Sequence, residues 1–264
     1  MKTVFTIGNT DVDCDTLLLE IGEDYCCAAL LKLGERTFYS IRYITYDELE
    51  AEKSLPVFLE ELSSNFERIF VCSAFSQSLL IPNQYTVNQY SLFNAIYDVP
   101  FQKQFTDAIP EWQMVAGYSI PSSVLKLITE RFYPIQFLHV YTPILKVYNG
   151  FTASDQIDIH FSPKLFRIIV RKEKQVQLAQ TYSYKTPLDV VYYLLKICYE
   201  FGLNQSEVLV IISGLIDEDS ALYSELHNYF LNLHFAQPPS YSVPENEYPH
   251  HYFTSLYNLA ACVS

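Results

Sequence analysis

Glycine is scarce in this sequence, with only 7 glycines among 264 residues. Loops that wrap a phosphate in backbone N–H groups depend on glycine, because a side chain would block the close approach of the backbone. The chain has no Gly-Lys-Ser/Thr phosphate loop and no glycine triplet of the dinucleotide-binding type. It also has no nucleophile elbow, because no glycine lies two residues before Ser213. These absences exclude the common sequence signatures of nucleotide binding and of the α/β-hydrolases.

Basic residues are also few, since 17 Lys and Arg face 30 Asp and Glu and the net charge is −13. An acidic surface repels phosphate backbones, so nucleic acid and anionic lipid are poor candidates as partners. No apolar run reaches the length of a membrane span, and the first residues lack the apolar core of a signal peptide. We therefore expect a cytoplasmic protein with no nucleic-acid partner and no membrane span.

Metal-ligand motifs are lacking too. The six cysteines form no C-x-x-C pair (Cys14, Cys26, Cys27, Cys72, Cys198, Cys262), and Cys72 and Cys198, which lie in apolar runs, read as small buried hydrophobes. That pattern predicts reduced thiols in a cytoplasm. His250-His251 could be half of a metal site, but no ligand cluster lies at suitable spacing, so a surface loop is the favoured interpretation.

A partial calcium-loop pattern opens the chain. Asn9, Asp11 and Asp13 alternate as ligands would, and Glu20 follows at about the right distance. Cys14 occupies the position that needs glycine, however, and Glu20 falls within a predicted strand. A solvated acidic lead-in is therefore favoured, and we assign no metal-binding or catalytic residue.

The clearest local pattern lies in residues 203–239. Residues 207–213 form an apolar, β-branched run that predicts a strand buried on both faces, and Ser213-Gly214 ends it. A helix capped at Asp219-Ser220 and a short strand at residues 232–236 follow. Strand, glycine turn, helix and strand is the local form of a nucleotide-handling α/β domain.

The first part of the chain predicts three strands, a helix and a fourth strand. The strands are expected at residues 16–22, 25–33, 37–45 and 68–73. Asp47 and Glu50 read as a capping box for the helix between the third and fourth strands. Pro56 is expected to interrupt that helix, with a second segment starting after Ser54.

The second half predicts the same order. Its strands are expected at residues 156–161, 165–171, 175–182 and 207–213. Thr186 and Asp189 read as a capping box with Pro187 at the first helical position, and Gly202 ends the helix. Three pairs of matching positions are 139, 140 and 140 residues apart: Asp47 and Thr186, Glu20 and His160, Ser73 and Ser213. The spacing favours a duplicated β-β-β-α-β unit over chance similarity of two α/β segments.

Further elements are expected between and after the two repeats. We predict a strand at residues 112–120, a helix at 122–132 and a strand at 135–140. Residues 237–251 are rich in Pro and Tyr and predict a surface loop. A closing helix is expected at residues 251–263.

Five successive features resemble actin-like (ASKHA) proteins of the pilus-assembly and cell-division type, and more specifically an uncharacterised bacterial family with an actin-like ATPase fold. They are residues 115–121 with their helix, residues 135–143, the hairpin 156–171, the strand 207–214 with its turn, and the helix and strand that reach Pro238. The resemblance implies an α/β protein of two duplicated ribonuclease-H-like lobes in β-β-β-α-β-α-β order, each built on a mixed five-stranded sheet. The lobes would be residues 1–150, which include a connecting segment, and residues 151–264, with a cleft between them.

The resemblance also implies where a nucleotide would bind. Active members carry an Asp-x-Gly loop in the first hairpin of each lobe and two or three glycines after the fourth strand of the second lobe. The matching positions here are Glu20-Ile21-Gly22, His160-Phe161-Ser162 and Ser213-Gly214. The implied candidates are Glu20, Gly22, Asp158, Ser162, Ser213 and Gly214. Glu20 and Asp158 would flank Mg²⁺, and Gly214 would lie beneath the adenine of ATP.

Three functions follow as hypotheses. The first is a catalytically degenerate actin-like protein that acts as a cytoplasmic binding or scaffold module for a protein partner. The second is an ATP-binding switch or weak ATPase, and the third is a sugar-kinase-like enzyme, for which no base aspartate is evident. A cluster of tyrosines could mark the partner face, although tyrosines more often belong to the core (Tyr182, Tyr184, Tyr192, Tyr193). The oligomeric state is left open.

Overall fold

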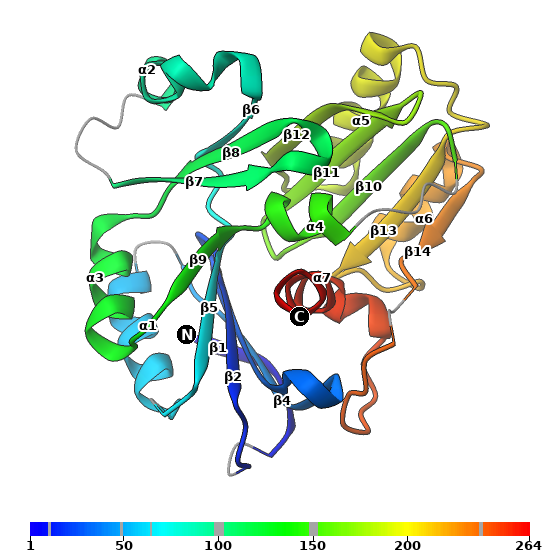
Figure 1. The fold of residues 1–264 in the computed structure, drawn as a ribbon. Helices are drawn as coiled ribbons and strands as arrows, with labels where there is room; N and C mark the ends of the chain where they lie inside the picture. Colours follow the sequence, from blue (N-terminus) through cyan, green and yellow to red (C-terminus); the bar gives the residue numbers. More distant parts are fainter. Residues whose placement is uncertain (10–11, 48–49, 64, 98–102, 148–152, 238–239) are drawn as a thin grey trace. The chain divides into compact units, whose positions relative to one another are not determined.

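A computed structural model describes residues 1–9, 12–47, 50–63, 65–97, 103–147, 153–237 and 240–264. It divides the chain into two compact units (Figure 1). Unit 1 comprises Met1–Val147, Ser240–Glu247 and Leu256–Ser264, and unit 2 comprises Tyr148–Pro239 and Tyr248–Ser255. None of the helices in the described ranges has the length and apolar character needed to cross a membrane.

Unit 1 is built on a six-stranded mixed sheet in the order β1-β4-β3-β2-β5-β9. Its strands are β1 (Lys2–Gly8), β2 (Thr16–Ile21), β3 (Tyr25–Lys32), β4 (Thr37–Thr45), β5 (Arg68–Ser73) and β9 (Gln136–His139). Strand β2 is buried along its whole length, as its continuous apolar run predicts. It pairs antiparallel with β3 and parallel with β5. Edge strand β1 was not predicted.

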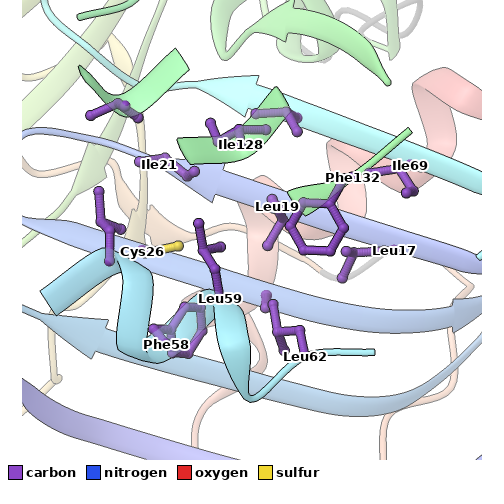
Figure 2. Close-up of a cluster of buried hydrophobic side chains, with 14 of the residues drawn as sticks. Leu17, Leu19, Ile21, Cys26, Phe58, Leu59, Leu62, Ile69, Ile128 and Phe132 are labelled. Carbon is purple, nitrogen blue, oxygen red and sulfur yellow. The ribbon is translucent and has the colours of Figure 1, made fainter. Parts of the chain in front are cut away.

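The core of unit 1 lies between one face of this sheet and two helices, α1 (Ala51–Glu60) and α3 (Ser122–Arg131). Figure 2 shows Leu17, Leu19 and Ile21 of β2 beside Phe58 and Ile128 of the helices. Alternate residues of a strand point to opposite faces, so this odd-numbered set leaves Glu20 on the other face.

Helix α1 differs from the prediction. Glu50 is its N-cap and makes no side-chain cap hydrogen bond, whereas the predicted capping box of Asp47 with Glu50 spans residues 48 and 49, which lie outside the described residues. The helix continues through Pro56 instead of breaking there. Proline removes a hydrogen bond to the carbonyl four residues earlier, which here belongs to the exposed Glu52 in the first turn. Water can satisfy that carbonyl, and the burial of Phe58 and Leu59 retains the helix.

A small sheet is inserted in unit 1 between β5 and α3, and most of it was missed. Its order is β6-β8-β7, from β6 (Ser78–Pro82), β7 (Gln104–Ile109) and β8 (Met114–Ser119), with η3 (Asn83–Asn88), α2 (Gln89–Tyr97) and η4 (Pro110–Trp112) in the connections. Only β8 was predicted as a strand. Asp107 of β7 accepts hydrogen bonds from the His139 backbone N–H and the Thr142 hydroxyl, both at 2.7 Å, and so ties this sheet to the end of β9 and the start of α4 (Tyr141–Val147).

Unit 2 confirms the predicted β-β-β-α-β-α-β order. Its mixed sheet runs β12-β11-β10-β13-β14, from β10 (Gln156–Phe161), β11 (Leu165–Lys172), β12 (Gln175–Ser183), β13 (Leu209–Gly214) and β14 (Leu233–Phe235). Helices α5 (Pro187–Phe201) and α6 (Ala221–Tyr229) pack on one face and complete a second core. Thr186 and Asp189 form the predicted capping box of α5, and Ser220 caps α6.

The two units repeat the same hairpin geometry, with one correction to the alignment. Gly22 N donates to Tyr25 O at 3.0 Å, and Ser162 N donates to Leu165 O at 2.9 Å, so the turns match at the predicted separation. The parallel pairs β2–β5 and β10–β13 do not match at that separation. Ser73 pairs with Ile21, whereas Phe161, the equivalent of Ile21, pairs with Gly214. The equivalent of Ser73 is therefore Gly214, one residue beyond the predicted match with Ser213.

The end of the chain corrects the predicted second lobe of residues 151–264. Residues Ser240–Glu247 and Leu256–Ser264 belong to unit 1. Phe38 N of β4 donates to Ser242 O at 2.9 Å, and the Phe38 and Tyr257 ring centroids are 5.7 Å apart. The predicted loop ends earlier than expected, because η5 (His250–Phe253) and α7 (Thr254–Val263) follow. The predicted boundary after residue 150 lies outside the described residues.

Candidate functional site

Glu20 and Gly22 lie in the β2–β3 hairpin of unit 1, and the hairpin itself engages both. Glu20 is buried and accepts a short hydrogen bond from the Tyr25 hydroxyl. The Tyr25 ring is also buried and stacks on Tyr43 with centroids 5.2 Å apart. The carboxylate at the implied magnesium-ligand position thus already accepts a hydrogen bond from Tyr25, three residues after Gly22.

Gly22 makes room for the same ring. A Cβ at this position would lie 2.8 Å from Tyr25 Cε1, closer than side chains pack. The Tyr46 hydroxyl lies 2.9 Å from Gly22 O and 2.8 Å from Tyr25 O, and holds both ends of the turn. The glycine that a phosphate loop would need is therefore required here by the packing of Tyr25.

Glu23, which no sequence pattern singled out as a site residue, lies in the turn between β2 and β3. Its Oε1 accepts a hydrogen bond of 2.7 Å from the Ser76 backbone N–H, just after β5. Backbone N–H groups at such turns are the usual donors to bound anions. Here a carboxylate of the protein takes that place. The contact spans 53 residues, so only the acidic character of the turn could have suggested it.

Asp158, the candidate magnesium ligand of unit 2, is paired with Arg171 of the neighbouring strand. Arg171 Nη1 contacts Asp158 Oδ2 in a short ion pair, and Gln156 Nε2 donates to Oδ1 at 2.8 Å. The Arg171 side chain is completely buried. An Asp neutralised by a guanidinium in this setting has little charge left to attract a divalent cation.

Ser162 and Ser213 use their hydroxyls within the sheet. Ser162 Oγ donates to Leu165 O at 2.9 Å and closes the β10–β11 turn. Ser213 Oγ donates to Ile159 O at 3.2 Å, and His160 Nδ1 lies 3.0 Å from Ser213 Oγ. Because the Ser213 hydrogen is directed at Ile159, the His160 nitrogen is the donor in this contact. Burial and the positive charge of Arg167 hold the pKa of His160 well below its ordinary value, so the ring is neutral at pH 7.

Gly214 is required by strand pairing. Its φ is +80°, and an added Cβ would lie 2.1 Å from Phe161 O. That carbonyl accepts from Leu215 N at 2.9 Å as β10 and β13 run in parallel. Glycine is the residue that meets both conditions, since other side chains are strained at positive φ.

The six candidates thus form two groups. Glu20 and Gly22 lie in unit 1, and in unit 2 Asp158 lies on β10, Ser162 in the turn after it, and Ser213 and Gly214 at the end of β13. Both carboxylates have internal donors, and both glycines are explained by packing or backbone conformation. In chemical terms, these groups are arranged to stabilise their own hairpins. Their role toward a nucleotide stays a prediction.

The remaining sequence candidates lie elsewhere. Tyr182 stacks on Tyr193 at 4.3 Å, Tyr184 packs on Phe166, and Tyr192 is exposed, so the proposed tyrosine face is mostly the edge of the unit 2 core. Buried His251 stacks on Phe235 at 4.2 Å.

Asp11 of the partial calcium pattern lies outside the described residues. Within the described ranges, no group of three or more His, Cys, Asp and Glu residues could hold a metal ion. All six cysteines are free thiols, and burial raises the pKa of Cys198 to about 11.

Comparisons with known proteins agree with this architecture. A family model described as "Protein of unknown function (DUF3822)" matches residues 13–233. A Bacteroides thetaiotaomicron protein with an actin-like ATPase fold and unknown function superposes with a TM-score of 0.77 at 16% identity, covering 94% of this chain and 95% of that one. The PilM–PilN type IV pilus biogenesis complex gives a TM-score of 0.64 at 12% identity, covering 94% and 98%. No curated protein sequence matches. The predicted actin-like ATPase fold is confirmed.

Proposed function

The chain belongs to the DUF3822 family of proteins of unknown function and has an actin-like ATPase fold. We propose that it is a catalytically degenerate actin-like protein. It works as a cytoplasmic module that binds a protein partner and does not hydrolyse ATP. The proposal combines a fold that handles nucleotides in active members with hairpins whose polar groups are already engaged.

One observation carries this proposal: the hairpin residues that would receive phosphate and Mg²⁺ are bonded to their own unit. Tyr25 donates to Glu20, the Ser76 N–H donates to Glu23, and Arg171 pairs with Asp158. A nucleotide would have to displace these bonds before making its own. Each displaced buried hydrogen bond costs about 1 kcal/mol or more, which lowers the affinity by a comparable amount.

The PilM–PilN structure supports the partner half of the proposal. In that complex a protein of the same fold is bound to a second protein. A fold whose nucleotide site has been closed can retain such a binding role, because protein binding uses surface residues and not the hairpin turns.

Equilibrium dialysis with Mg-ATP at millimolar concentration, together with thermal unfolding, tests the nucleotide half. We expect no retained nucleotide and no rise in Tm. Glu20→Gln is the matched control, because its amide oxygen can still accept from Tyr25 while the proposed magnesium ligand is lost. The variant should behave like the wild type with and without Mg-ATP.

The alternative ATP-binding switch predicts a different pattern. A ligand at 100 times its Kd stabilises the folded state by about 2.7 kcal/mol, so Mg-ATP would raise the Tm of the wild type by several degrees. A rise that requires Mg²⁺ and disappears in Glu20→Gln would refute the degenerate site and establish the switch.

A further inference from the structure

The insertion in unit 1 carries a surface of exposed large apolar side chains. Five of them lie within η3 and α2, and we call this set the η3–α2 surface: Tyr85, Val87, Tyr90, Leu92 and Ile96. Val87 is 93% exposed and Ile96 60% exposed. Scattered exposed apolar residues are normal on soluble proteins, but five in one short stretch indicate a contact surface.

Helix α2 is attached to the inserted sheet by two side chains. Phe93 is buried, and its ring lies against Gly117 of β8, where a Cβ would be 3.9 Å from Phe93 Cδ2. The Tyr97 hydroxyl donates to Ser78 O of β6 at 2.8 Å. Leu92 and Ile96 lie on the stripe of the helix beside these two anchors and stay exposed. An apolar helix stripe that its own sheet does not cover is typical of an element with a further partner.

The surface is also free of charge. Residues 69–97 contain no Asp, Glu, Lys, Arg or His, although the chain has a net charge of −13. Exposed polar neighbours on the same elements are amides or hydroxyls (Asn83, Gln84, Ser91, Asn94). Loss of charged residues and enrichment of tyrosine distinguish the centre of protein interfaces from the rest of the surface.

We propose that the η3–α2 surface is a self-association interface, occupied by the same surface of a second copy of this chain. Charge is the reason for choosing a copy. Two chains of the same negative sign repel, and an uncharged apolar patch lets them meet without placing like charges opposite each other. A twofold interface also needs a patch that complements itself, which an uncharged apolar surface does.

The available area is consistent with a weak dimer. The five side chains expose on the order of 500 Å² per copy, so two copies would bury about 1,000 Å² from these residues alone. That value is near the lower limit for a specific interface. We therefore expect a weak, reversible dimer, formed more tightly as salt screens the repulsion between the acidic chains.

Sedimentation velocity of the full chain from 1 to 200 μM tests the proposal. The wild type should shift from monomer to dimer, and the shift should strengthen between 50 and 500 mM NaCl. Val87→Glu places a charge in the interface and should weaken association at least tenfold. The matched control is Tyr199→Glu, which adds the same charge at an 85% exposed apolar position of unit 2 and should associate like the wild type.

Each other outcome counts against the proposal. A wild type that stays monomeric at 200 μM overturns it, and so does a dimer that Val87→Glu leaves unchanged. Equal weakening by Tyr199→Glu would show that net charge alone controls association. The inference is independent of the proposed function, because the same samples can be run with and without Mg-ATP and neither result requires nucleotide binding.

Discussion

The β2–β3 hairpin of unit 1 and the β10–β11 hairpin of unit 2 share their turn hydrogen bond but treat their acidic residue differently. Glu20 receives the neutral hydroxyl of Tyr25, whereas Asp158 is paired with the guanidinium of Arg171. A hydrogen bond from a neutral hydroxyl to a carboxylate adds about 2 kcal/mol to stability, whereas breaking a buried ion pair costs about 3–5 kcal/mol. The two hairpins therefore engage their acidic side chains at different positions and with different donors, and the two should respond differently to substitution.

The largest contrast is expected on removal of the two donors. Arg171→Met should destabilise unit 2 by about 3 kcal/mol, because it leaves the Asp158 charge on a largely buried strand without its cation. Tyr25→Phe should cost unit 1 only about 1–2 kcal/mol. Hydrogen exchange of peptides from β10 and β11, compared with peptides from β2 and β3, measures each unit separately.

A second substitution separates loss of the pair from general damage. Adding Asp158→Asn to Arg171→Met removes the unpaired charge and should recover part of the loss. A double variant no more stable than Arg171→Met, or a Tyr25→Phe cost above that of Arg171→Met, would contradict the distinction between the two hairpins.

The next contrast is in how the stability of the two units changes with falling pH. In unit 2 the pKa of His160 is lowered by burial and by Arg167, and burial also lowers the pKa of His251. The unfolded chain then takes up protons first, so unit 2 loses stability as pH falls below about 6.5, by up to about 1.4 kcal/mol per pH unit for each histidine. In unit 1 burial raises the pKa of Asp107. A raised carboxyl pKa has the opposite sign, because the folded state binds the proton first and gains relative stability in acid.

Urea unfolding at pH 7 and pH 5.5 measures this difference. The single tryptophan, Trp112, belongs to unit 1, where its Nε1 donates to Leu145 O at 2.9 Å, so its fluorescence reports that unit. Far-UV circular dichroism reports the whole chain. At pH 5.5 the dichroism transition should begin at lower urea than the fluorescence transition, and His160→Gln should reduce the gap in part. Two curves that move together would remove the proposed contrast.

The elements of the two repeats could be predicted because their signals are local. The β2 and β13 strands are continuous apolar runs, and Thr186 with Asp189 is a capping box within four residues. The inserted sheet was missed because residues 76–109 lack a clear periodicity of apolar residues. Strands β6 and β7 both pair with β8, which follows them in the sequence.

The chemistry of the candidate site was harder to foresee. Resemblance identified Glu20, Asp158 and Gly214 as nucleotide positions, but their actual partners depend on side-chain direction. The Glu23 contact with Ser76 N joins residues 53 positions apart, and the match of Gly214 with Ser73 depends on a strand register that sequence spacing missed by one residue. Pairing across a sheet, unlike helix capping, leaves no signature in neighbouring residues.

The smallest contrast concerns the helices that follow the two hairpins. Thr186 Oγ1 accepts from Asp189 N at 3.3 Å at the start of α5, whereas Glu50 at the start of α1 makes no side-chain cap bond. Thr186→Ala should therefore destabilise unit 2 by about 1 kcal/mol, and Glu50→Ala should change unit 1 by no more than a few tenths. Thr186→Ser keeps the capping oxygen and should match the wild type in the same urea and hydrogen-exchange measurements. Equal costs for Thr186→Ala and Glu50→Ala would mean that α1 has a cap of the same strength, and the helices would then differ less than the hairpins that precede them.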